Sequence, residues 1–204
     1  MIGKKGKDLK LLDNYRGISI PGVTGKVLDE VLKNRRMSTC LAAQNDLQLG
    51  FTKGLSPLMA ALLLSEAMTH AAEQGETLYI ASLDAKKAFD VVDHLALFKQ
   101  LEAEGTDPVI WKTLKEWYDG LSSSVKWQGV TTDNFAVKRG VRQGGIFSSG
   151  LYKTFLNELL SRIQRSSLGY TIGNIDLSCP TVADDVLLLA NAPANLQGML
   201  NISY

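Results

Sequence analysis

Two acidic segments far apart in the sequence carry the side chains best suited to chemistry. Asp84 follows an apolar run at residues 78–81, and Asp184 and Asp185 are adjacent inside a second apolar run at residues 181–189. Carboxylates in apolar surroundings are costly because they lose hydration and repel one another. A divalent cation would offset both effects, and Mg²⁺ favours a few carboxylates together with waters and phosphates. The two segments therefore predict a metal site for phosphoryl or nucleotidyl transfer.

These acidic segments belong to a series of five short motifs, which lie at residues 14–19, 48–54, 84–94, 139–145 and 182–185. In order and spacing the series resembles the reverse transcriptase domain of non-LTR retrotransposons. The first two motifs resemble the fingers motifs of that family, and the other three resemble its palm motifs. Group II intron and other cellular reverse transcriptases are more distant relatives. A lone Asp-Asp pair would be weak evidence, whereas five ordered matches identify the family.

The resemblance implies an RNA-directed DNA polymerase that uses two Mg²⁺ ions, for which Mn²⁺ can substitute. It implies that Asp84, Asp184 and Asp185 are catalytic, and that they bind the metals together with the Ala85 carbonyl. Adjacent residues of a strand point to opposite faces, so Asp184 and Asp185 reach the metals equally only if the turn bends them together. We therefore expect Asp84 and Asp184 to be the main ligands and Asp185 to be a looser third. A salt-bridged surface pair in a hairpin turn is the alternative.

The resemblance also implies how substrates bind. It places the incoming nucleotide against five residues, namely Lys10, Arg16, Phe89, Gln143 and Gly144. It places template and primer against four others, namely Arg142, Gly145, Val182 and Ala183. Phe89 occupies the family's aromatic position beneath the sugar, where its ring would exclude a 2′-hydroxyl and favour deoxynucleotides. A core phenylalanine at that position is equally compatible with the spacing.

Two positions depart from the family's pattern. Val182 replaces a bulky aromatic residue two positions before Asp184, which changes the packing expected beneath the primer end. Residues 146–150 replace the Ser-Pro that follows the glycines of the second palm motif. Without proline the entry into the next helix is less fixed. Neither change removes a carboxylate.

Hydrophobic periodicity predicts an α+β protein. The resemblance implies that it forms the fingers and palm of a right-hand polymerase, with a small antiparallel palm sheet packed on helices. The fingers are expected at residues 1–75 and 95–138, and the palm at 76–94 and 139–204. The chain is expected to be truncated after the Ala-Asp-Asp motif, without a thumb. Helices are expected at 23–37, 56–73, 95–104 and 108–118, and after the second palm motif. A strand is expected at 78–83, and a second at 181–190, which the acidic pair interrupts so that Asp184 lies in a hairpin turn. Residues 124–127 are expected to pair with 134–138 around Gly129.

Composition adds few constraints. The 204 residues carry a net charge of +1, so a nucleic-acid surface must come from uneven placement of charge. Cys40 and Cys179 are isolated and are expected to be buried thiols. The apolar stretch at residues 58–64 is far shorter than the roughly 20 residues that span a bilayer. We expect an intracellular, soluble protein, in either nucleus or cytoplasm, with no membrane partner. Its partners would be an RNA template, a DNA primer, dNTPs, and the thumb and endonuclease regions of a longer polyprotein.

Two other functions compete with reverse transcription. A truncated or decayed palm fragment would lack catalysis and act at most as a nucleic-acid-binding or protein-binding module. A viral type of RNA-templated RNA polymerase shares the palm chemistry. Phe89 and the sequence Ala183-Asp184-Asp185 disfavour that second alternative.

Overall fold

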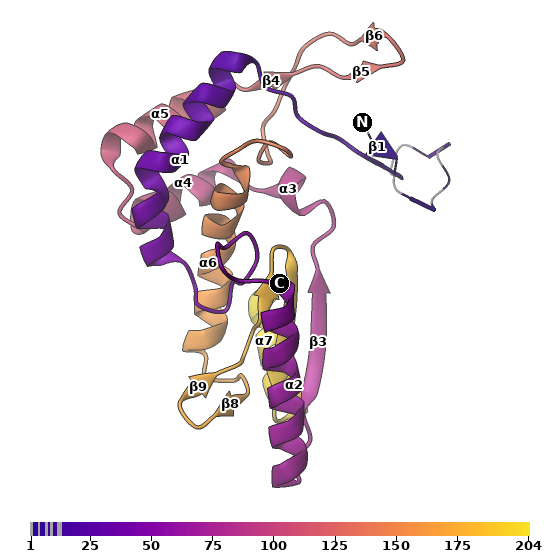
Figure 1. Cartoon of the computed structure of the whole chain (residues 1–204), viewed down its shortest axis with the longest axis vertical. Coiled ribbons are helices and arrows are strands. Elements are labelled where there is room, and N and C mark those ends of the chain that lie inside the picture. Colours follow the sequence, from indigo (N-terminus) through magenta and orange to yellow (C-terminus); the bar gives the residue numbers. More distant parts are fainter. Residues whose placement is uncertain (1, 4, 7, 9, 12–13) are drawn as a thin grey trace. The chain divides into compact units, whose positions relative to one another are not determined.

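The computed structural model describes residues 2–3, 5–6, 8, 10–11 and 14–204, and of Arg16 and residues 36–42 it describes the backbone alone. The chain folds into two compact units, each built from two separate stretches (Figure 1). Unit 1 combines Met1–Leu41 with Lys87–Tyr152, and unit 2 combines Ala42–Lys86 with Lys153–Tyr204. Helices and small antiparallel sheets occur in both, so the α+β class is confirmed.

Unit 2 contains a three-stranded antiparallel sheet in the order β10-β11-β3. Its strands are β3 (Tyr79–Asp84), β10 (Thr181–Val182) and β11 (Asp185–Ala190). Along β11 the residues after Asp185 are mostly buried, which places the strand within the core. The interruption expected within 181–190 is a two-residue turn at Ala183 and Asp184, so β10 and β11 form a hairpin and Asp185 begins β11.

Helices and a small hairpin surround this sheet. Helix α2 (Pro57–Gln74) begins after Ser56 and ends at Gly75, whose φ of +67° is the left-handed conformation that glycine accepts easily. Ser56 holds the N-cap position without a side-chain cap hydrogen bond. Helix α7 (Pro193–Ser203) packs on β11 and β3, and α2 contacts β10 and β8. The remaining pieces are the hairpin strands β8 (Thr171–Ile172) and β9 (Ile175–Asp176).

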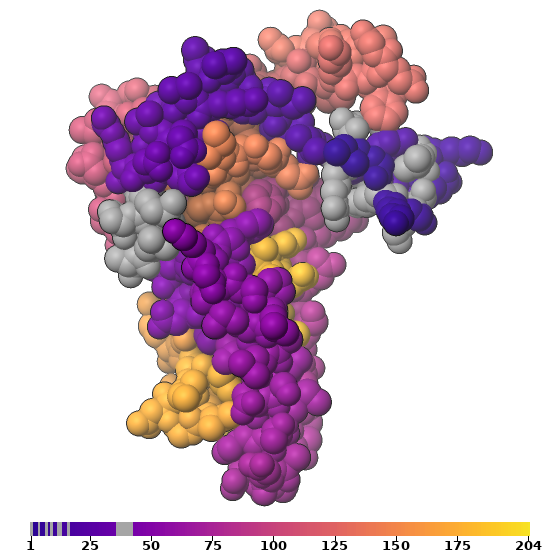
Figure 2. Space-filling model, viewed as in Figure 1, coloured from indigo at the N-terminus to yellow at the C-terminus, as the bar shows by residue number. Residues whose placement is uncertain are grey.

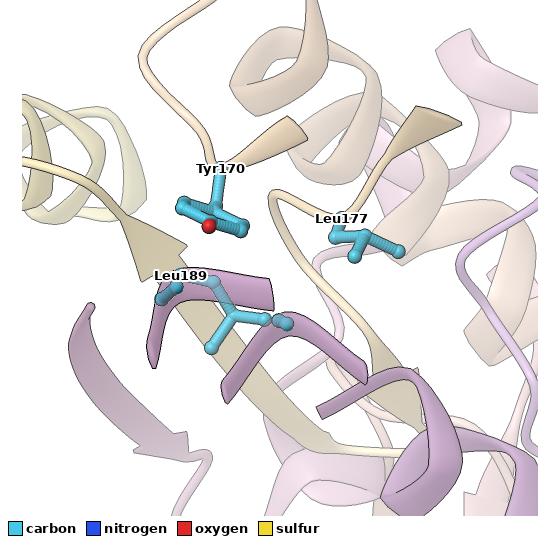
Figure 3. Close-up of a cluster of buried hydrophobic side chains, with 5 residues drawn as sticks. Tyr170, Leu177 and Leu189 are labelled. Carbon is cyan, nitrogen blue, oxygen red and sulfur yellow. The ribbon is translucent and has the colours of Figure 1, made fainter. Parts of the chain in front are cut away.

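A cluster of buried side chains joins α2, the β8–β9 hairpin and β11 (Figure 3). Its members come from all three elements, namely Ala67, Ala71, Tyr170, Leu177 and Leu189. The small alanines let α2 approach closely, and the aromatic ring and leucines fill the space. The hydroxyl of Tyr170 is 2.9 Å from Nδ1 of His70, so its polar atom has a partner at the edge of the cluster.

Unit 1 is mainly helical. Helix α1 (Val23–Ala43) continues beyond the expected end at residue 37. Helices α3 (Ala88–Val91), α4 (His94–Ala103) and α5 (Pro108–Asp119) follow in sequence, and the last two lie where they are expected. Helix α6 (Ser148–Arg165) follows the second palm motif, and like α1 it continues from one unit into the other.

The short strands of unit 1 correct one prediction. Strand β4 (Ser122–Ser123) pairs with β7 (Phe135–Ala136), and β5 (Lys126–Trp127) pairs with β6 (Val130–Thr131). The expected pairing of 124–127 with 134–138 was therefore wrong. Gln128 and Gly129 have φ of +48° and +83°, the signs of a type I′ turn, which closes β5 directly onto β6. A further pair, β1 (Ile2–Gly3) with β2 (Tyr15–Arg16), lies near the N-terminus.

A polar cluster lies inside unit 1 between α1, α5 and the second palm motif. The guanidinium carbon of Arg142 is 4.1 Å from the ring centroid of Trp117. Asp29 is only 6% exposed, and its Oδ2 has no hydrogen-bond partner. Burial raises the pKa of Asp29, against the opposing charge of Arg142 and a hydrogen bond from the backbone of Ile146. Burial also raises the pKa of Tyr118 to about 12.

Surface and thiol properties complete the picture. Within the described residues, no helix combines the length and the apolar character needed to cross a membrane. Cys179 is fully buried, as expected, and burial raises its pKa to about 12. The side chain of Cys40 lies outside the described residues.

Helix α2 lies at the surface in Figure 2, and its outer side exposes apolar residues that include Leu58, Leu62 and Met68.

Replacing Leu189 by alanine should lower the free energy of unfolding by about 2–5 kcal/mol, because it leaves a cavity under α2. Urea unfolding followed by circular dichroism measures the change. Leu62→Ala is the matched control: this leucine of α2 is 56% exposed, and its loss should cost no more than about 0.5 kcal/mol. Equal losses for the two variants would contradict the packing described here.

The buried carboxyl of Asp29 predicts a pH-dependent stability. Its pKa in the folded protein lies above the ordinary value of 3.8, so the folded state retains a proton that the unfolded chain has lost. Stability relative to Asp29→Asn should therefore fall as the pH rises from about 3.8 through the raised pKa. Urea unfolding at several pH values measures this difference in the free energy of unfolding. Asp46→Asn, at an exposed aspartate, is the control. A difference that grows in favour of the wild type would instead show that pairing with Arg142 dominates.

Candidate active site

The register of the sheet in unit 2 brings two of the three candidate carboxylates together. Asp185 of β11 is the direct cross-strand partner of Asp84, the last residue of β3. Side chains of directly opposite residues lie on the same face, with Cβ atoms about 4.5–5.5 Å apart. Both carboxylates are exposed. Asp184 is partly buried and belongs to the two-residue turn between β10 and β11, so the strict alternation of a strand does not govern its direction.

This arrangement concentrates negative charge at one end of the sheet. Like charges directly opposite each other in a sheet are destabilising. Among the side chains that the structure describes, no cation forms a salt bridge with any of the three. The described residues also contain no group of three or more acidic, histidine or cysteine side chains placed to share one metal ion. The structure therefore gathers a pair of carboxylates with a third beside it. Exposed, unpaired carboxylate oxygens are a donor set that fits Mg²⁺.

The turn that carries Asp184 adopts an unusual conformation. Ala183 has a φ of +60°, which residues with a Cβ seldom adopt, whereas the φ of Asp184 is not positive. Those are the signs of a type II′ turn, in which glycine normally occupies the first position. Val182 precedes the turn and pairs with Asp185 across the hairpin. Ala85 directly follows Asp84 and is exposed.

Gln48 explains how this turn is held, and sequence reasoning missed it. Its side chain is fully buried. Its Oε1 accepts a hydrogen bond from the N–H of Ala183 at 3.1 Å, and its Nε2 donates to the carbonyl of Ala183 at 3.1 Å. One carboxamide thus binds both polar backbone atoms of one residue. The available signal was a glutamine between Leu47 and Leu49 just before a glycine, in a motif assigned only to the fingers.

The backbone around Gln48 lies directly against β10. The N–H of Leu49 donates to the carbonyl of Thr181 at 2.8 Å, and the N–H of Thr181 donates to the carbonyl of Leu47 at 2.8 Å. This is a short parallel bridge along the outer edge of the hairpin. A Cβ on Gly50 would overlap the backbone nitrogen of Ala183 and would lie 2.8 Å from its Cα. Glycine is therefore required for this close approach.

Helix α6 fixes the same segment from its other side. Lys153 is 6% exposed, and its Nζ donates to Oε1 of Gln44 at 2.6 Å and to the Phe51 carbonyl at 3.3 Å. One turn later, Asn157 donates to the carbonyl of Ala43 at 3.0 Å and accepts from the N–H of Asn45 at 3.2 Å. Buried polar side chains thus connect α6 through residues 43–52 to the turn that bears Asp184.

In unit 1, α3 brings Phe89 against the second palm motif. The N–H of Val141 donates to the carbonyl of Phe89 at 2.7 Å, and the N–H of Gly140 donates to that of Val92 at 2.8 Å. Gly140 has a φ of +91°, and a Cβ there would lie 2.9 Å from the Phe89 carbonyl oxygen. The ring of Phe89 stacks on Tyr152, with 4.9 Å between centroids.

Gln143 and Gly144 lie beside the first fingers motif. The N–H of Ser19 donates to the carbonyl of Gln143 at 2.8 Å, and Gly144 lies next to Ile18 and Ser19. Gly145 then closes a turn, donating its N–H to the carbonyl of Arg142 at 2.8 Å. Helix α6 begins three residues later without the family's proline.

The other predicted substrate contacts have different surroundings. Arg142 is half-buried against Trp117, so a contact with template would have to come from the part of its side chain that remains exposed. Lys10 is exposed, and its backbone N–H donates to Oδ1 of Asp8 at 3.0 Å. Arg16 is placed by its backbone, in β2, and its side chain lies outside the described residues. In unit 1, Phe89 thus lies beside Val141, whereas Gln143 and Gly144 lie beside residues 18–19.

Two solved structures with a similar fold are telomerases. The structure of the Candida albicans telomerase in complex with a fragment of telomeric RNA matches with a TM-score of 0.55 and 18% identity, over 87% of this chain and 32% of that one. The apo telomerase of Candida tropicalis matches with a TM-score of 0.55 and 16% identity, over 87% of this chain and 35% of that one. At these identities the likeness shows the fold, which agrees with fingers and palm.

Pol polyproteins of retrotransposable elements are among the curated relatives. The polyprotein of a type-2 element of Drosophila melanogaster is 29% identical over 92% of this chain and 18% of its own length. That of the type-1 element R2 of Popillia japonica is 31% identical over 93% of this chain and 26% of its own length. The chain thus spans about a fifth to a quarter of these relatives. Residues 2–203 match the reverse transcriptase (RNA-dependent DNA polymerase) family, and the chain belongs to that family.

Proposed function

We propose that this chain is the fingers and palm of an RNA-directed DNA polymerase of a non-LTR retrotransposon, and that it adds deoxynucleotides to a primer 3′-hydroxyl. The observation that carries the proposal is the register that sets Asp185 opposite Asp84, beside the turn that holds Asp184. The relatives include retrotransposon polyproteins and an RNA-directed DNA polymerase from the mobile element jockey, and both support the substrate class.

The carboxylates would hold the metal ions on which the chemistry depends. Asp84, Asp184 and Asp185 supply oxygen donors, with the Ala85 carbonyl as a further donor. Two Mg²⁺ ions, or Mn²⁺ in their place, would stabilise the attacking and leaving oxygens of the transfer. The chain's own task is to keep these side chains at fixed positions at one end of a rigid sheet. The β3–β11 pairing and the hydrogen-bonded turn do this.

Residues of unit 1 would bind the incoming nucleotide. Phe89, Gln143 and Gly144 would bind the incoming nucleotide, with Arg16 and Lys10 on its triphosphate, where a guanidinium and an ammonium suit phosphate oxygens. Arg142, Gly145, Val182 and Ala183 would contact RNA template and DNA primer. The telomerase with a similar fold is bound to RNA, which supports a nucleic-acid partner. The longer relatives support a polyprotein in which thumb and endonuclease regions accompany this segment.

Primer extension on a poly-rA/oligo-dT template with Mg²⁺ and dTTP tests the proposal. Asp84→Ala and Asp184→Ala should each abolish extension, because each removes a carboxylate that would hold the metal ions. Glu73→Ala, which removes an exposed carboxylate of α2 in unit 2, is the control and should leave extension unchanged. Circular dichroism confirms that each variant is folded.

The result also separates the competing functions. A folded wild-type chain that extends nothing would indicate a fragment without catalysis, acting at most by binding nucleic acid or protein. Extension that survives both substitutions would contradict the assignment of the carboxylates. Extension with ribonucleotides as efficient as with dTTP would favour the RNA polymerase alternative.

Phe89→Ala should relax the preference for dTTP over UTP by roughly 10-fold or more, since removal of a ring that blocks the 2′-hydroxyl changes a steric selection worth 1–3 kcal/mol. The ratio of kcat/KM for the two nucleotides measures it. Phe135→Ala, at a phenylalanine that is 49% exposed, is the matched control. An unchanged ratio with reduced stability would identify Phe89 as a packing residue only.

A further inference from the structure

We propose that Gln48 is the positioning residue of the metal site, holding the Ala183–Asp184 turn so that the carboxylates keep the geometry metal binding needs. The inference rests on the proposed function for the metal, but its structural part is independent of it. Gln48 lies 135 residues before Ala183 in the sequence. In this proposal it contacts neither metal nor substrate. It acts through the backbone of the turn.

The contacts of Gln48 are specific to an amide. Its Oε1 accepts from the N–H groups of both Gly50, at 2.9 Å, and Ala183, at 3.1 Å, while its Nε2 donates to the Ala183 carbonyl at 3.1 Å. A carboxylate can reproduce the two acceptor contacts and not the donor contact. A methionine of similar length can reproduce none. The side chain is fully buried, so water cannot easily replace these partners.

The turn has a specific need for this support. Ala183 carries a φ of +60°, and a non-glycine residue in a sparsely populated conformation costs about 1–3 kcal/mol when its surroundings do not enforce it. Gln48 enforces it by binding the N–H and the C=O on either side of the Ala183 Cα. Without Gln48, both groups would be buried without partners or would rotate toward water. Either change redirects Asp184, the next residue.

The position of Gln48 is itself fixed by hydrogen bonds to neighbouring residues. Its own carbonyl accepts from Nε2 of Gln44 at 2.9 Å, and the carbonyl of Gln44's side chain accepts from Lys153 of α6. The parallel bridge between Gln48 and Thr181 sets its distance from the hairpin. A glutamine held this rigidly transmits the position of α6 to the turn, as groups behind metal ligands do when they orient those ligands.

Two measurements test the proposal on the whole chain. Amide hydrogen exchange, followed by NMR, reports the hydrogen bonds at Ala183 and Gly50. Mn²⁺ alone, titrated by electron paramagnetic resonance, reports the metal site without turnover. Gln48→Met should remove protection at both amides and weaken Mn²⁺ binding by about 10-fold or more. Gln48→Glu keeps the acceptor oxygen, so it should retain protection at both amides.

Leu177→Ala is the control. It removes a buried side chain from the cluster of α2, the β8–β9 hairpin and β11, outside the turn and residues 43–52. It should lower the free energy of unfolding and leave Mn²⁺ affinity unchanged. Asp84→Ala should abolish Mn²⁺ binding and shows whether the carboxylates hold the metal at all.

Four outcomes would contradict the positioning role of Gln48 or the metal site on which it rests. In Gln48→Met, the Ala183 amide could exchange rapidly while the Mn²⁺ affinity is unchanged. That result would show that Gln48 has a structural role only. Equal weakening of Mn²⁺ binding by Leu177→Ala would show a general loss of stability instead of positioning. Wild-type Mn²⁺ binding that ignores Asp84→Ala would overturn the proposed metal site and, with it, the positioning role. If Gln48→Met does not fold, unprotected Ala183 and Gly50 amides in the wild type would by themselves overturn the proposal.

Discussion

The antiparallel pairing of β3 with β11 is the constraint on which the candidate site depends. Because the side-chain period of a strand is two, a slip of one residue would move Asp185 to the face opposite Asp84. The buried side chains of β11 prevent that slip, since it would expose Val186 and Leu188. The same pairing that buries the core therefore sets the two carboxylates side by side, and their mutual repulsion is the cost of that placement.

Residues 43–52 are the second support of the site, and they join parts of the chain that are remote in sequence. They are bound on one side by Lys153 and Asn157 of α6, and on the other by the β10–β11 hairpin. Much of this binding uses buried side-chain amides and an ammonium in place of apolar packing. Buried polar groups of this kind stabilise one arrangement over its alternatives, because any shift leaves them without partners.

Much of the fold was predictable from sequence, as was the approach of the two acidic segments to each other, and the rest depended on contacts that no local pattern encodes. The strands around Asp84 and Asp185 and the helices from Pro57 onward follow from periodicity and from proline and glycine signals. The family, predicted from five ordered motifs, is confirmed. The β5–β6 pairing was missed because Gln128 adopts a positive φ that glutamine rarely signals. Gln48 and the buried Asp29 were missed because their roles come from partners distant in the chain.

The contact between Gly50 and Ala183 limits how this protein can vary over generations. The atoms that a Cβ at position 50 would meet are the backbone nitrogen and Cα of residue 183, which every amino acid possesses. A smaller side chain at 183 could not make room, so no second substitution there could restore the first. Pairs of core side chains can exchange volume by compensating changes, but this pair cannot. Position 50 is therefore closed to neutral drift for as long as the turn keeps its place.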